Sequence, residues 1–270
     1  MRAFSPSRRG IAATVATLGL TAAAVAAAPT AQADTTGGYV ALGDSYSAGV
    51  GAGSYISSSG DCEQSTNAYP YLWAQANNPS SFSFQACSGA TTATVLSSQL
   101  SALNSSTSLV SISVGGDDAG FSSVMETCVL DGTSDCQTAV TNAENFVNTQ
   151  LAPKLDAVYS AIQSDAPNAS VTVMGYPELY EIPGDCWFGI STASETALNG
   201  AADDIDGVIS TEAAKYGFNF GDVRPAFSGH QICSDDSWMN STTVPVSSSY
   251  HPDADGQASG YLPTFSAFTG

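Results

Sequence analysis

Short apolar runs alternate with longer amphipathic segments along most of this chain. Runs too short for a helix, each bounded by turn residues, predict strands at 39–42, 82–86, 109–114, 170–175 and 217–222. Apolar positions repeated every three or four residues predict helices at 67–76, 93–103, 138–164 and 194–215, with a last one near 256–268. Strands that alternate with helices favour a parallel sheet of about five strands covered on both faces, a three-layer α/β/α sandwich.

Three stretches rich in serine, glycine and aspartate, at 47–66, 115–137 and 228–255, are predicted to be loops. Inside the helix expected at 138–164, Pro153 predicts a kink or a restart. Parallel strands end at the same edge of a sheet, and open α/β sheets bind their ligands there. We therefore expect the functional residues in the turns that follow the strands.

Residues 1–33 have the features of a secretory signal peptide. Arg2, Arg8 and Arg9 precede an alanine-rich apolar stretch at 11–28, and the sequence at 31–33, Ala-Gln-Ala, fits a small-residue cleavage site. Cleavage there leaves residues 34–270, a length suited to a single domain of an extracellular protein. The paired arginines leave the twin-arginine export route open, and a retained membrane anchor is the alternative to cleavage.

The remaining chain is strongly acidic. It carries all 25 acidic residues but only three basic ones, Lys154, Lys215 and Arg224. Such a charge repels nucleic acid and anionic membranes, so neither is expected as a partner. No segment after residue 33 is apolar enough to span a bilayer, so we expect no stable membrane insertion. Nothing in the pattern requires a second chain, and we expect a monomer.

Six cysteines in an exported chain predict three disulfides. Sequence order alone permits several pairings, but local spacing favours the pairs Cys62–Cys87, Cys128–Cys136 and Cys186–Cys233. The chain has no CxxC motif, and neither histidine has a neighbour at ligand spacing. We therefore expect neither a metal site nor a cofactor.

Two segments about 200 positions apart hold the candidate catalytic pair. GDSYSAG at 43–49 follows an apolar run directly, which places Ser45 at the end of a strand. YHPDADG at 250–256 places His251 in a loop before the last predicted helix. A serine nucleophile needs a base within hydrogen-bond reach, and histidine is the usual one. The competing readings are a helix cap without chemistry at Ser45, and His230 as the base.

Two further turns follow predicted strands at the same edge. ACSGA ends the second strand and places the Gly89 amide in position to face a site, while GGDDAGF follows the third. Together with VMGYPELY, FGDVRPAFSGHQIC and YHPDADGQASGYLP, these blocks occur in an order that resembles the SGNH (GDSL-type) hydrolases. The similarity extends over 38–264 and is strongest to secreted actinomycete lipases, esterases and phospholipases.

The resemblance implies a flavodoxin-like fold and hydrolysis of acyl esters through an acyl-serine, and it supports the three disulfides. When the roles of the family's motif residues are transferred to this chain, the resemblance implies that Ser45 is the nucleophile and His251 the base. The oxyanion hole comprises the backbone N–H groups of Ser45 and Gly89 and the side chain of Asp117. A sugar-ester or feruloyl esterase is the alternative enzyme. A binding protein that keeps the fold without turnover is the alternative outside enzymes.

The chain departs from the family pattern at the residue that orients the histidine. Many members have an aspartate three residues before it, where this chain has Ser248. We expect the backbone carbonyl of Ser248 to accept the Nδ1 proton of His251. Asp253 and Asp255 follow the histidine and are expected to cap the final helix.

A second departure lies in the oxyanion hole, because Asp117 stands where the family has asparagine. An ionised carboxylate only accepts hydrogen bonds and would repel an oxyanion, whereas a protonated carboxyl can donate. Burial and a neighbouring carboxylate, either Asp118 or Asp44, would raise the pKa of Asp117. The sequence thus predicts an enzyme suited to acidic conditions, with impaired activity as the alternative.

Several aromatic residues are candidates to line an acyl groove or, equally, to lie in the core. They are Tyr46, Tyr55, Tyr176, Tyr180, Trp187 and Phe188.

Overall fold

The computed structural model describes residues 1–3, 37–184, 186 and 189–269. The predicted signal peptide lies almost wholly outside the described residues, as do Trp187 and Phe188. The signal peptide and its cleavage therefore remain predictions.

Five parallel strands form one sheet, in the spatial order β2-β1-β3-β4-β5. All five strands were predicted, although their ends differ by up to about two residues, as is common at element boundaries. Their bounds are β1 Gly38–Gly43, β2 Ser81–Phe84, β3 Thr107–Ser113, β4 Ser170–Met174 and β5 Asn219–Gly221. Nearly every residue of β1 and β3 is buried, including the polar Ser111 and Ser113 of β3, as a sheet covered on both faces requires.

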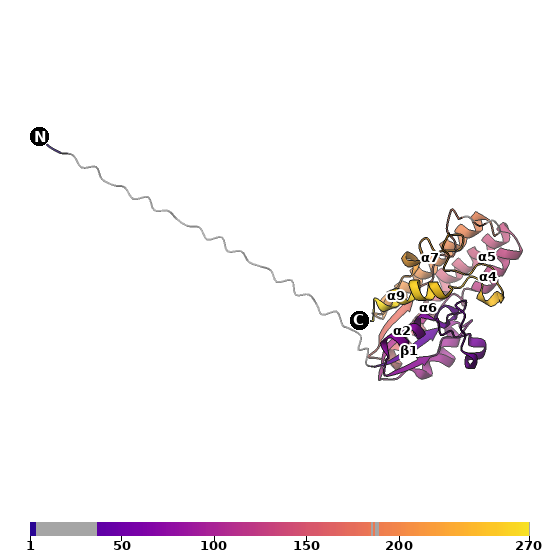
Figure 1. Ribbon diagram of the computed structural model, residues 1–270, viewed down its shortest axis with the longest axis horizontal. Helices are drawn as coiled ribbons and strands as arrows, with labels where there is room; N and C mark the ends of the chain where they lie inside the picture. Colours follow the sequence, from indigo (N-terminus) through magenta and orange to yellow (C-terminus); the bar gives the residue numbers. More distant parts are fainter. Residues whose placement is uncertain (4–36, 185, 187–188, 270) are drawn as a thin grey trace. The chain divides into compact units, whose positions relative to one another are not determined.

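Two layers of helices cover the sheet and give the predicted three-layer sandwich (Figure 1). On one face, Tyr39 of β1 packs its ring against Trp73 and Phe265, with ring centroids 5.1 and 5.6 Å away. These residues belong to α2 (Tyr69–Asn77) and α9 (Leu262–Ser266), which contact each other. The other layer contains α3 (Thr92–Thr94), α6 (Ala152–Asp165) and α7 (Thr192–Lys215).

The remaining helical segments are short or lie towards one end of the sheet. They are α1 Ser45–Ala48, α4 Phe121–Leu130, α5 Thr133–Phe146, α8 Arg224–Phe227, η1 Ser57–Cys62, η2 Val95–Gln99, η3 Leu100–Ala102, η4 Val147–Leu151, η5 Val246–Ser248 and η6 Gly256–Tyr261. Helices α4, α5 and α7 pack together at the end of the molecule away from α2 (Figure 1).

The prediction of a loop at 115–137 is wrong, because this range contains α4 and the start of α5. Met125 and Cys128 are buried at helical spacing, but the surrounding serine, glycine and aspartate residues obscure the pattern. Pro153 does not break its helix. It lies in the first turn of α6, where no N–H is needed, and the wide π-helical turn η4 leads into it from α5.

All three predicted disulfides are present, between Cys62 and Cys87, Cys128 and Cys136, and Cys186 and Cys233. The first ties the loop after β1 to the turn after β2, close to Gly89 in the sequence. None of the helices in the described ranges has the length and apolarity to cross a bilayer.

Candidate active site

Ser45 begins α1 directly after the turn that ends β1. Gly43 in this turn has φ +122°, and a Cβ there would lie 2.4 Å from the carbonyl oxygen of Ser113 on β3. The buried side chain of Gln99 accepts a hydrogen bond from Gly43 N and donates one to Gly43 O. Glycine is therefore required at this crossing, and the serine is held at the carboxyl edge of the sheet.

His251 lies against Ser45 although 206 positions separate them in the sequence. Its Nε2 is 2.7 Å from Ser45 Oγ, and both residues are almost fully buried. The imidazole packs on the ring of Tyr46, with centroids 5.0 Å apart. The Tyr46 hydroxyl in turn donates to the carbonyl of Tyr250. The geometry matches that of a nucleophile and its general base.

The group that orients His251 is the carbonyl of Ser249, not that of Ser248. His251 Nδ1 is 2.9 Å from Ser249 O. Tyr250 has a left-handed backbone with φ +62°, which turns the carbonyl two residues before the histidine back towards its ring. The Ser248 hydroxyl lies 3.4 Å from that of Tyr55 instead. Because a carbonyl only accepts, Nδ1 carries the proton and the lone pair of Nε2 faces Ser45.

Burial lowers the pKa of His251 to about 4, while the Ser249 carbonyl opposes this shift by stabilising the charged ring. The imidazole is therefore neutral, and able to accept a proton, above about pH 4.

His230, the alternative base, contacts Trp238 and Asp236 and makes no hydrogen bond to Ser45. Its ring stacks on Trp238 with centroids 3.5 Å apart, and its Nδ1 lies 2.8 Å from Asp236 O.

Asp44 is a buried carboxylate next to Ser45 in the sequence, and it accepts hydrogen bonds from three donors. It accepts from Tyr46 N at 3.0 Å, from Ser113 Oγ at 2.6 Å and from the hydroxyl of Tyr176. Burial raises the pKa of Asp44, and the nearby charge of Asp117 raises it further. The three donors favour its ionised form.

Asp117 lines the same cavity as Ser45 and Asp44. Burial raises the pKa of Asp117 to about 6, with a further contribution from the Asp118 carboxylate. Asp118 itself accepts from the backbone N and the hydroxyl of Thr92, both at 2.7 Å, and lies 3.7 Å from Lys154 Nζ. No donor to the Asp117 carboxyl comes from the described residues. The three donors to Asp44 stabilise its ionised form, and Asp117 has no comparable donors among the described residues.

The other two predicted oxyanion donors are backbone amides. Ser45 is the first residue of α1, where N–H groups have no acceptor inside the helix. Gly89 has φ +74°, and a Cβ there would meet no atom within 4 Å, so this position borders open space.

The two aspartates predicted to cap the last helix differ. Asp253 accepts a hydrogen bond from Gly256 N at 2.9 Å. Asp255 is the residue before η6, and its side chain forms no capping hydrogen bond with the described residues.

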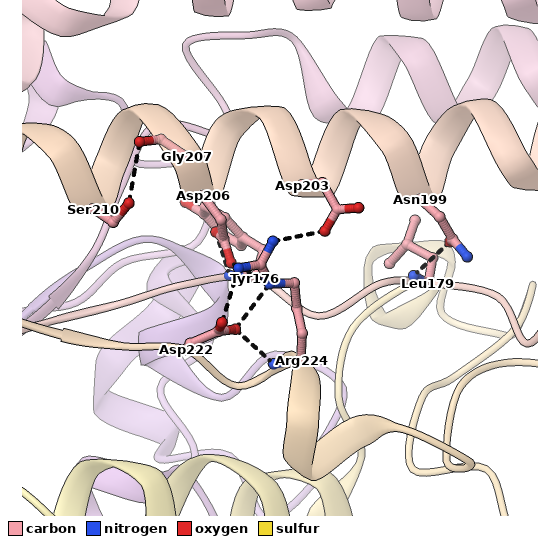
Figure 2. Close-up of polar contacts among 9 residues, drawn as sticks. All are labelled: Tyr176, Leu179, Asn199, Asp203, Asp206, Gly207, Ser210, Asp222 and Arg224. Carbon is pink, nitrogen blue, oxygen red and sulfur yellow. Dashed lines mark hydrogen bonds and ion pairs between the residues drawn. The ribbon is translucent and has the colours of Figure 1, made fainter.

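Tyr176 connects this site to a charged cluster on α7 (Figure 2). Its hydroxyl donates to Asp44, and its backbone N donates to the buried Asp206 Oδ1 at 2.9 Å. Arg224 forms hydrogen-bonded ion pairs with Asp203 and Asp222, and its Nε lies 3.6 Å from Asp206 Oδ2.

One turn before Asp203 on α7, Asn199 Oδ1 accepts from the backbone N of Leu179 and of Tyr180. Helix α7 thus fixes the backbone of residues 176–180 beside the site. Only the aromatic character of Tyr176 could be read from the sequence; its hydrogen bonds to Asp44, Asp206 and Gly116 could not.

A cavity lined mainly by apolar side chains opens beside Ser45. Tyr46 and Tyr176 line it, as do small residues of α5 and α7, among them Ala143, Ala201 and Ala202. Its larger apolar residues are Phe121, Val124, Val147, Leu179, Leu198 and Ile205. Of the other aromatic candidates, Tyr180 and Tyr55 do not line this cavity. Among the residues that the structure describes, no cluster of His, Cys, Asp or Glu is arranged to hold a metal ion.

The GDSL-like Lipase/Acylhydrolase family profile matches residues 41–258. Lipase 1 of Streptomyces coelicolor is 55% identical over 245 residues, which cover 90% of each chain. The crystal structure of an extracellular lipase from Streptomyces rimosus has a TM-score of 0.85 and 52% identity, covering 86% of this chain and 100% of that one. A phospholipase A1 from Streptomyces albidoflavus has the same TM-score and 53% identity, covering 86% and 99%.

Proposed function

This chain belongs to the GDSL-like lipase/acylhydrolase family, and from that premise we propose that it cleaves acyl esters through an acyl-serine intermediate. It is a carboxylic ester hydrolase, as its relatives are. The observation that carries the proposal is the line of contacts from Ser45 Oγ through the imidazole of His251 to the carbonyl of Ser249.

In the first step, Ser45 Oγ attacks the ester carbonyl carbon and its proton passes to His251 Nε2. The tetrahedral intermediate collapses as the carbon–oxygen bond to the alcohol breaks, and His251 returns the proton to the leaving alcohol. Water then attacks the acyl-serine with His251 again as base, which releases the carboxylic acid and restores Ser45.

We assign the oxyanion hole to the N–H groups of Ser45 and Gly89 and to the protonated carboxyl of Asp117. Each such donor lowers a barrier by about 3–4 kcal/mol when it is aimed at the developing charge. The raised pKa of Asp117 and the absence of a donor to it among the described residues support a protonated form. Ionised Asp117 would face the oxyanion with a like charge.

The two titrating groups set opposite limits on activity. Neutral His251 is required, so activity rises as the pH passes its pKa of about 4. Protonated Asp117 is required, so activity falls as the pH passes its pKa of about 6. We therefore propose an optimum at acidic pH, between these two values.

The apolar cavity beside Ser45 supports a fatty acyl chain as the group that is transferred. Lipase and phospholipase A-type activities both fit this cavity, and the similar phospholipase A1 structure supports the second. A sugar-ester or feruloyl esterase is a weaker candidate, because such substrates present a polar or rigid group to the site. The competing proposal outside enzymes is an impaired binding protein, since Asp117 replaces an amide donor.

We also propose that the protein is secreted after loss of residues 1–33. The leader pattern, the three disulfides and the extracellular lipase among its relatives support this. An N-terminal sequence beginning at Asp34 in the protein recovered from culture medium is the expected result.

The direct test of the function is hydrolysis of p-nitrophenyl butyrate across the acidic and neutral range, with Ser45→Ala as the control. We expect serine-dependent release of p-nitrophenol with an acidic optimum. A wild-type rate equal to that of Ser45→Ala at every pH would refute the function and favour the impaired binding protein. Phosphatidylcholine, triglyceride and acetylated xylan then distinguish the substrate classes.

A further inference from the structure

Large apolar side chains that are exposed in the described part of the chain occur mainly at the end of α4, at η5 and in nearby loops. Val244 is 92% exposed, Val246 75% and Leu130 69%. Tyr55, Val129 and Ile182 are exposed to between 38% and 40%. We refer to these six residues as the apolar rim. Leu96 is also exposed, to 40%, but it lies on η2 and is not part of the apolar rim.

Part of the apolar rim lies on the chain segment that orients His251. Val244 and Val246 belong to the segment that ends in Ser249, whose carbonyl binds His251. The Ser248 hydroxyl in that segment lies 3.4 Å from the hydroxyl of Tyr55.

Across from this segment, Val129 lines a surface hollow together with Tyr180, Thr242 and Tyr250. Ile182 follows Tyr180 by two residues. The segments that carry Tyr55 and Val129 therefore lie beside Ser248 and Tyr250, which precede His251 closely in the sequence.

The charges beside the apolar rim are negative. Asp131 follows Leu130, Glu181 precedes Ile182, and Glu63 accepts a hydrogen bond from Ser247 at 3.3 Å. The three basic residues after position 33 lie on other segments, α6, α7 and α8, and each is paired with a carboxylate. Carboxylates around an apolar surface attract a lipid layer whose outermost charge is a cation. The same carboxylates repel a lipid layer with an anionic surface.

We propose that the apolar rim docks on the surface of a bilayer of zwitterionic, choline-headgroup lipid. The valines and leucine enter the boundary between headgroups and acyl chains, and the carboxylates face the choline ammonium groups. A few short side chains bury little area, so the attachment is shallow and reversible. Docking in this orientation presents the cleft at Ser45 to the lipid surface. The inference rests on the proposed function, for which it identifies the physical form of the substrate.

Sedimentation with lipid vesicles tests the proposal, with the secreted protein carrying Ser45→Ala so that no lipid is hydrolysed. We expect binding to phosphatidylcholine vesicles and weaker binding to phosphatidylglycerol vesicles. Adding Val244→Ser and Val246→Ser should weaken the binding to phosphatidylcholine at least about tenfold, because two valine side chains that are partly buried in the lipid when docked are lost. The control Leu96→Ser removes an exposed apolar residue outside the rim and should leave binding unchanged.

A second measurement uses the valine double variant with Ser45 intact. Its hydrolysis of soluble p-nitrophenyl butyrate should match that of wild type, while its hydrolysis of phosphatidylcholine vesicles falls. Equal loss on both substrates would overturn the proposal, because the segment would then act by orienting His251. Undiminished vesicle binding by the double variant, tighter binding to phosphatidylglycerol, or an equal loss in Leu96→Ser would also overturn it. Failure of the proposed function appears separately, as absent hydrolysis of the soluble ester by wild type.

Discussion

Replacing Asp117 by asparagine should remove the alkaline limit on activity. Asparagine has a similar shape, and its amide donates a hydrogen bond at every pH. In wild type the same position donates only while the carboxyl holds its proton, and burial together with Asp118 raises its pKa to about 6. Asp117→Asn should therefore show a flat rate from acidic to mildly alkaline pH. Wild type should decline over the same range.

The size of the effect follows from that pKa. Two units above it, about 1% of the enzyme holds the proton, so wild-type kcat/KM near pH 8 should be about 100-fold below its plateau. This loss is within the 10²–10³ range, roughly, that one oxyanion donor contributes. Asp117→Asn should accordingly exceed wild type by up to about 100-fold near pH 8 and differ little from it near pH 5. The acid limb near pH 4, set by His251, should remain in both proteins.

The assay is hydrolysis of p-nitrophenyl butyrate, followed at the wavelength where p-nitrophenol and its anion absorb equally. Asp118→Asn is the matched control, because it removes the neighbouring charge but leaves Asp117 in place. Its alkaline limb should move to lower pH without disappearing, since loss of that charge lowers the pKa of Asp117. If Asp117→Asn keeps the alkaline limb of wild type, protonation of residue 117 does not control activity and the assignment is wrong.

Three further changes test the surroundings of the site. Ala202→Trp should shorten the apolar cavity, so that kcat/KM for p-nitrophenyl palmitate falls at least tenfold, roughly, while that for the butyrate ester changes little. Replacing Cys62 and Cys87 by serine opens a loop of 25 residues and should cost about 3.5 kcal/mol of unfolding free energy, measured with urea. Asp206→Ala leaves the buried N–H of Tyr176 without its acceptor and should cost about 2 kcal/mol, whereas Asp206→Asn keeps an acceptor and should cost less. Equal losses in the two Asp206 variants would contradict this account.

The order of strands and helices, and with it the three-layer fold, could be read from the sequence, because apolar periodicity reports which residues face the core. The contact between Ser45 and His251 was also accessible. Ser45 directly follows a predicted strand, and His251 lies in a predicted loop. The ends of parallel strands and the loops that follow them meet at one edge of the sheet. Helix α4 was missed, because its apolar positions lie among residues typical of loops.

Other features depended on the tertiary structure. The carbonyl of Ser249 orients His251 because Tyr250 adopts a left-handed backbone, and no local pattern in the sequence marks a tyrosine for that conformation. The hydrogen bond of Tyr176 to Asp44 joins residues 132 positions apart, through a loop that Asp206 holds in place. Residue types and their periodicity determine which surfaces are buried and which strands can align. The direction of a carbonyl and the distance between two carboxyls depend on how the loops pack, and sequence spacing does not encode that packing.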